Sequence, residues 1–173
     1  MKPLVLLVAR IFLGLSFLVF GWAKVSGEPV FGDPAAGAKS FSQFFPQFVQ
    51  NSLDHGHPFW FWRPVLEVAV RPAPGVFAFC VAWGEFLLGL SLLLGALVVP
   101  SAVGGIGLLA SIQFCDNPFA REGPLWTKVG GLLEHGSVAL LLLILAANGA
   151  GRFFGLDGIV FREQGKGPSK SGP

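Results

Sequence analysis

The sequence has few of the residues on which soluble, secreted and nucleic-acid-binding proteins depend. Charged residues make up 13% of its 173 residues, against roughly 25% in an average soluble domain, and the net charge is +2. A charge this small and dispersed argues against nucleic-acid binding, which uses a concentrated basic surface. Its two cysteines, Cys80 and Cys115, exclude a disulfide-rich scaffold and do not form a CxxC redox pair. There is no tyrosine, so phenylalanine and tryptophan supply the aromatic side chains.

Hydrophobic residues are abundant instead. They account for 53% of the chain, and the mean hydropathy is +0.65. About 20 helical residues cross the hydrocarbon of a bilayer, and the sequence has four apolar runs, the third of them short and rich in glycine. We therefore expect an all-α, integral membrane four-helix bundle over residues 1–164, followed by a disordered basic tail at 165–173. The expected spans are about 3–23, 76–99, 101–116 and 129–148, with an interfacial loop at about 24–75.

The first run has an alternative interpretation. Lys2 and the Gly21-x-Ala23 tripeptide resemble the charged start and the cleavage site of a signal peptide. The run is longer than the usual apolar region of a signal peptide and contains Arg10, so we interpret it as the first span. Four spans put both termini on one side of the membrane. Basic residues are divided almost evenly between the two sides, so charge favours neither orientation.

The long connection between the first two spans contains an amphipathic segment. Four phenylalanines and a valine in residues 41–49 recur at helical spacing, and the helix begins either near Ser40 or at Pro46. Its aromatic face is expected to lie in the bilayer interface or to cap the bundle. His55 and His57 follow without any Cys or His at ligand spacing. We interpret them as a solvated loop pair and predict no metal site.

Glu85 is the single ionisable residue of the second run and lies near its middle. A carboxylate at this depth is costly unless it is paired or protonated, so it should face the protein interior. Arg10 lies inside the first span, and we predict an intramembrane Arg10–Glu85 ion pair. Such a pair is either structural, fixing helix register, or functional. Small residues share the helix faces of these charges and allow close helix packing, notably Gly14, Gly21 and Gly89.

Further polar residues converge at the loop-side end of the expected bundle. Lys24, Glu134 and His135 are predicted to line a mouth that holds a quinone-like headgroup, although for Lys24 alone we favour snorkelling to the interface, which is common at helix ends. Cys80 and Cys115 belong to the same end and are either a thiol–disulfide couple or small buried hydrophobes. His135 alone does not make a metal or tetrapyrrole site.

Three glycine-containing motifs lie at the start, the centre and the end of the chain. They are RxxxGxxFxxxGxxK at residues 10–24, GExxxGxxLLLG at 84–95, and GxGRxxGLD at 149–157, the last of which includes Gly151, Arg152 and Asp157. In this order they resemble the DoxX family of small four-helix membrane proteins. The long aromatic first loop is similar to that of the longer members.

The resemblance implies a four-helix bundle in a bacterial inner membrane, with both termini in the cytoplasm. It also implies an association with quinone-linked or thiol redox chemistry, as in the small subunit of a thiosulfate:quinone oxidoreductase. We expect no intrinsic cofactor, a quinone as the ligand, and the bilayer and other membrane redox proteins as partners. The alternative is a non-catalytic accessory subunit that helps to assemble a larger membrane complex. A small transporter is disfavoured because the sequence has no internal repeat or broken helix.

Overall fold

The computed structural model describes residues 3–27, 40–115, 117–120, 124–152 and 155–159. The regular structure in these ranges is helical, which confirms the predicted all-α class. The four long helices are α1 (Pro3–Ser26), α4 (Pro74–Leu94), α5 (Val98–Phe114) and α6 (Leu125–Ala147). The short ones are α2 (Phe41–Asp54), α3 (Arg63–Val65), η2 (Leu66–Val70) and η3 (Ala150–Arg152). The predicted tail at 165–173 lies outside the described residues.

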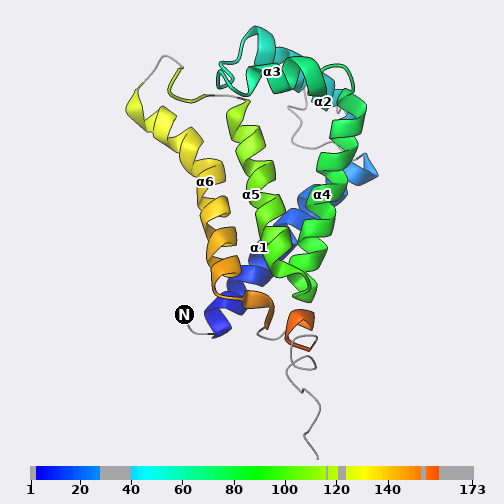
Figure 1. The fold of residues 1–173 in the computed structure, drawn as a ribbon, viewed down its shortest axis with the longest axis vertical. Helices are drawn as coiled ribbons and strands as arrows, with labels where there is room; N and C mark the ends of the chain where they lie inside the picture. The colour runs from blue at the N-terminus through cyan, green and yellow to red at the C-terminus, as the bar shows by residue number, and fades with distance from the viewer. Residues whose placement is uncertain (1–2, 28–39, 116, 121–123, 153–154, 160–173) are drawn as a thin grey trace, which may run out of the picture.

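The long helices alternate in direction and form one bundle (Figure 1). α1, α4 and α6 are long and apolar enough to cross a membrane, whereas α5 has 17 residues. At 1.5 Å per residue α5 is about 26 Å long, slightly less than the roughly 30 Å of bilayer hydrocarbon. The chain is therefore an integral membrane protein. The start of α1 and η3 lie at one end of the bundle, and α2 and α3 lie at the other (Figure 1).

Glycines let α1 and α4 pack with their backbones in contact. A Cβ atom on Gly21 would lie 2.6 Å from the Cα atom of Phe86, and one on Gly89 would lie 2.7 Å from the Cα atom of Leu18. Any side chain at these positions would push the helices apart, so the glycines fix both the distance and the register of the pair. This confirms the prediction that Gly14, Gly21 and Gly89 face a neighbouring helix.

The second span ends at Leu94 rather than at Val99, so the predicted boundary is wrong. Gly95 closes α4 in the left-handed conformation (φ 64°), and Leu97 is also left-handed (φ 54°). Glycine adopts this conformation without strain, but leucine rarely does. Pro100, which directly follows the predicted end of the span, lies in the first turn of α5. An amide hydrogen at that position has no partner within the helix, so proline is tolerated there.

α2 covers one end of the bundle. It begins at Phe41, with Ser40 at the N-cap position, and continues through Pro46. The earlier of the two predicted starts is therefore confirmed. Phe41 and Val49 are buried, and the helix lies above the loop-side ends of the long helices (Figure 1). The aromatic face thus caps the bundle, which is one of its two predicted positions.

The main hydrophobic core joins the four long helices. Its buried members come from all of them and include Leu6, Leu13, Leu92, Leu109, Leu142 and Leu145. A second buried cluster lies under the cap and brings α2 and η2 onto Cys115 at the end of α5. The first cluster holds the four long helices together, and the second holds the cap on the end of the bundle.

Candidate functional site

Glu85 is buried, as predicted, but its partner is Lys24. The Lys24 ammonium group donates to Glu85 Oε2, and the two side chains are 13% and 7% exposed. The Phe41 ring lies over the ammonium group, with its centroid 5.1 Å from Nζ, which is a cation–π contact. The ion pair therefore joins α1 to α4 beneath the first residue of α2.

The predicted Arg10–Glu85 ion pair is wrong. The glycine contacts between α1 and α4 fix a register that places the Arg10 guanidinium beside Gly95. Gly95 follows Glu85 by ten residues, which is about 15 Å at 1.5 Å per helical residue. The prediction assumed that both charges lie near the bilayer midplane. Backbone contact at the glycines instead shifts α1 along α4 and separates them.

Arg10 belongs to a second polar cluster at the terminal end of the bundle. Its side chain is 1% exposed, and Nη1 donates to the carbonyl oxygen of Ala150 at 2.8 Å. The nearby Asp157 carboxylate attracts the guanidinium. It also accepts hydrogen bonds from the backbone amides of Leu97 (2.8 Å) and Val98 (3.1 Å). Asp157 thereby satisfies the first amides of α5, which have no partner within the helix.

The glycines of the closing motif leave room for these charged groups. A Cβ atom on Gly151 would lie 2.9 Å from Cγ of Asp157, and one on Gly155 would lie 2.8 Å from Nη1 of Arg10. Arg152 ends η3 and is exposed. The motif GxGRxxGLD thus has a structural explanation, because it caps α5 and holds the buried arginine.

The structure does not bring Glu134 and His135 to Lys24. The first half of α6 lies on the opposite side of α5 from the end of α1 (Figure 1). Glu134 is exposed on α6 and His135 is half-buried, while Lys24 is held by Glu85. The predicted headgroup site formed by these three residues is therefore not assembled.

The two cysteines lie in different surroundings, and both are free thiols. Cys80 is exposed on α4, whereas Cys115 is buried beneath α2 and η2 and donates to the carbonyl oxygen of Ser111 at 3.2 Å. Burial raises the pKa of the Cys115 thiol. Since the thiolate is the reactive form of cysteine, Cys115 fits the alternative of a small buried hydrophobe.

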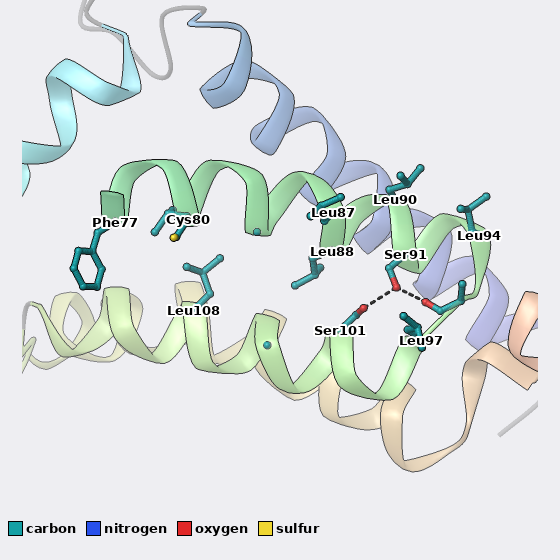
Figure 2. A pocket seen from close by; sticks show the side chains of 14 residues that line it. Phe77, Cys80, Leu87, Leu88, Leu90, Ser91, Leu94, Leu97, Ser101 and Leu108 are labelled. Carbon is teal, nitrogen blue, oxygen red and sulfur yellow. Dashed lines mark hydrogen bonds between the residues drawn. The ribbon is translucent and has the colours of Figure 1, made fainter. Parts of the chain in front are cut away.

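An apolar groove runs between α4 and α5 (Figure 2). Its volume is about 690 Å³, within the roughly 300–1,000 Å³ typical of small-molecule sites. Phe77 and Cys80 lie at one end of the groove and Leu97 at the other (Figure 2). Gly84 and Gly104 widen it, since a Cβ atom built on either would have no neighbour within 4 Å.

Two serines supply the polar groups near the Leu97 end of the groove (Figure 2). The Ser91 hydroxyl donates to the carbonyl oxygen of Ala96, and its oxygen lies 2.6 Å from that of Ser101. Because the Ser91 proton is used, Ser101 donates to Ser91, which leaves the lone pairs of the Ser101 oxygen as acceptors. Sequence reasoning missed both serines. Their positions on either side of Gly95 were the available signal.

These features define the class of protein: an integral membrane helix bundle with polar clusters at both ends of α1 and an apolar groove on its surface. The chain belongs to the DoxX family, since the family model matches residues 5–115. The first two motifs lie inside the matched region, and the closing motif lies beyond it. No curated protein and no solved structure matches the chain.

Proposed function

We propose that this protein is a membrane subunit that binds a quinone for a redox system. The groove between α4 and α5 is the observation that carries the proposal. It extends along α4 from Phe77 to Leu94, about 26 Å at 1.5 Å per residue. An isoprenoid tail is long, flexible and apolar, and the groove offers matching length and chemistry.

The groove is also accessible from the membrane. Among its lining residues, Leu87 and Leu94 are 54% and 50% exposed, and Cys80 is exposed as well. Exposed faces of membrane-spanning helices contact lipid, so a ligand dissolved in the bilayer enters the groove without crossing water. We place the protein in a bacterial inner membrane with both termini on the cytoplasmic side.

The headgroup in this proposal lies beside Ser101. The free lone pairs of its oxygen accept a hydrogen bond from a quinol hydroxyl, and rotation of the serine supplies a donor to a quinone carbonyl. A partner protein supplies two electrons and two protons are taken up when the quinone is reduced to quinol. This chain binds and positions the ligand. The Lys24–Glu85 pair lies on the α1 side of α4 and stabilises the scaffold.

Photolabelling tests the proposal. The purified protein in lipid nanodiscs would be irradiated with a photoreactive quinone that carries a polyprenyl tail, and the labelled peptides mapped. We expect label on α4 and α5, displaced by excess unlabelled quinone and reduced at least tenfold by Gly104→Leu, which fills the groove. Gly107→Leu adds the same side chain to open space on α5 outside the groove and should leave labelling unchanged. Label that is spread over all four helices, or insensitive to Gly104→Leu, would reject the proposal.

The second candidate function is that of an accessory subunit in a larger membrane complex. α6 favours it, because two residues of α6 are buried compared with six each of α1 and α4. A helix with so little of its surface covered has room for another protein. Recovery of the protein as a stable monomer from its native membranes would count against this candidate.

A further inference from the structure

Glu134 lies on the open face of α6 at a depth where a charge is costly. The apolar part of α6 runs from Val129 to Ala147, and Glu134 lies five residues into it, about 8 Å at 1.5 Å per residue. The side chain is exposed. No Lys or Arg in the described part of the chain pairs with it. Carboxylates within membrane spans normally pair with another group or face a protein interior, so this position indicates a missing partner.

Small residues on the same face allow another helix to approach. Gly130 and Ser137 lie four residues before and three residues after Glu134, the spacing of one helical face. A Cβ atom built on Gly130 would have no neighbour within 4 Å. Glycine and serine at helix contacts let backbones pack closely in lipid. The exposed face of α6 therefore allows a neighbouring helix to pack closely, and that helix would bury the Glu134 carboxylate.

A second copy of this chain does not supply the complementary charge. The four long helices contain three Lys or Arg residues. Arg10 is buried and bonded to Ala150, and Lys24 is paired with Glu85. Lys128 lies about 9 Å nearer the start of α6 than Glu134, at 1.5 Å per residue. Two copies related by an axis along the membrane normal would instead set Glu134 against itself at equal depth.

We propose that α6 docks against a spanning helix of a different membrane protein, which carries a Lys or Arg opposite Glu134. The partner helix packs over Gly130 and Ser137 and forms an intramembrane ion pair with the carboxylate. The inference rests on the second candidate function, because it names the chemistry of the partner, and it does not depend on a ligand in the groove.

Site-specific photocrosslinking in native membranes tests the inference. A photoreactive amino acid would replace Leu133, which is 59% exposed beside Glu134, or Val103, which is 64% exposed on α5, as the control. We expect position 133, and not 103, to crosslink to a peptide from an apolar helix that contains Lys or Arg. Crosslinks to a second α6, to lipid alone, or to a helix without a basic residue would overturn the proposal.

Exchanging the charges of Glu134 and the partner's basic residue tests the ion pair most directly. Glu134→Lys should reduce the crosslink at least tenfold, and changing the identified basic residue of the partner to Glu should restore it. Gly130→Leu should also reduce it, whereas Gly107→Leu, an equally open glycine on α5, should not. Thermal unfolding of each purified variant checks that it is folded.

Failure of the proposed α6 interface can be distinguished from failure of the accessory function. A protein that leaves its membranes as a monomer rejects the accessory function itself. A complex that persists with Glu134→Lys, and with crosslinks from another face, rejects the α6 interface while the accessory function stands.

Discussion

Lys24 and Glu85 form a largely buried ion pair that joins the C-terminal end of α1 to the middle of α4. Each charge compensates the other inside the membrane span, where an isolated charge is costly. Since Phe41 also covers the ammonium group, the pair connects the bundle with its cap. Its position between packed helices indicates a role in stability.

We predict that breaking this pair destabilises the protein more than removing it whole. Glu85→Gln leaves a largely buried ammonium group and should lower the free energy of unfolding by about 3–5 kcal/mol, whereas Lys24→Met with Glu85→Leu should recover much of the loss. Glu67→Gln is the matched control, because its pair with Arg63 at 2.9 Å is solvent-exposed and worth at most about 1 kcal/mol. Unfolding in mixed detergent gives the free energy of unfolding of all three variants. Equal losses for Glu85→Gln and Glu67→Gln would contradict a stabilising role for the buried Lys24–Glu85 pair.

We predict that Gly21 tolerates no side chain. Gly21→Ala places a methyl group against the backbone of Phe86 and should destabilise the protein by about 1–3 kcal/mol or more. Gly84→Ala adds the same methyl group to open space on α4 and should be neutral or stabilising by up to about 1 kcal/mol, because alanine favours helix. The same unfolding assay separates them. Similar stabilities for the two variants would mean that the α1–α4 backbone contact is absent.

We predict that Asp157 stabilises the start of α5. Asp157→Ala removes the acceptor for the Leu97 and Val98 amides and the carboxylate that attracts the buried Arg10. It should therefore cost at least the ~0.5–2 kcal/mol that the loss of other helix caps costs. Hydrogen exchange of these two amides should accelerate, while exchange in α4 should not. Asp54→Ala, at an exposed carboxylate that accepts from Gln50 at 2.8 Å, serves as the control. Unchanged exchange at Leu97 would exclude the capping role.

We predict that Leu97→Gly stabilises the protein. Leu97 is left-handed and 67% exposed, so glycine relieves backbone strain and removes little buried surface. The expected gain is about 0.5–1 kcal/mol in the free energy of unfolding. Leu87→Gly replaces a similarly exposed leucine inside α4 and should instead destabilise by about 1 kcal/mol. A loss of stability with Leu97→Gly would show that the left-handed turn is not formed.

The spans and their packing faces were predictable because each depends on local sequence. Long apolar runs indicated α1, α4 and α6, and glycines at helical spacing indicated the faces in contact. The end of α4 was harder to predict from the sequence, because Leu97 adopts a backbone conformation that leucine rarely adopts. The predicted span therefore extended to Val99, the residue before Pro100, instead of ending at Leu94.

The partner of Glu85 and the groove depend on three-dimensional register. Arg10 and Lys24 lie on one face of α1, and which of them meets Glu85 is decided by backbone contact at Gly21 and Gly89. The groove similarly arises where glycines of α4 and α5 leave space between the helices. Sequence shows where the glycines are, but not which neighbour each one faces.

Native mass spectrometry of the protein from its own membranes tests the central claim, that the α4–α5 groove binds a quinone. The wild-type protein and the Gly107→Leu variant should retain a mass that matches a polyprenyl quinone, and Gly104→Leu should lose it. The absence of such a mass from the wild-type protein, or its equal retention by all three proteins, would contradict the account.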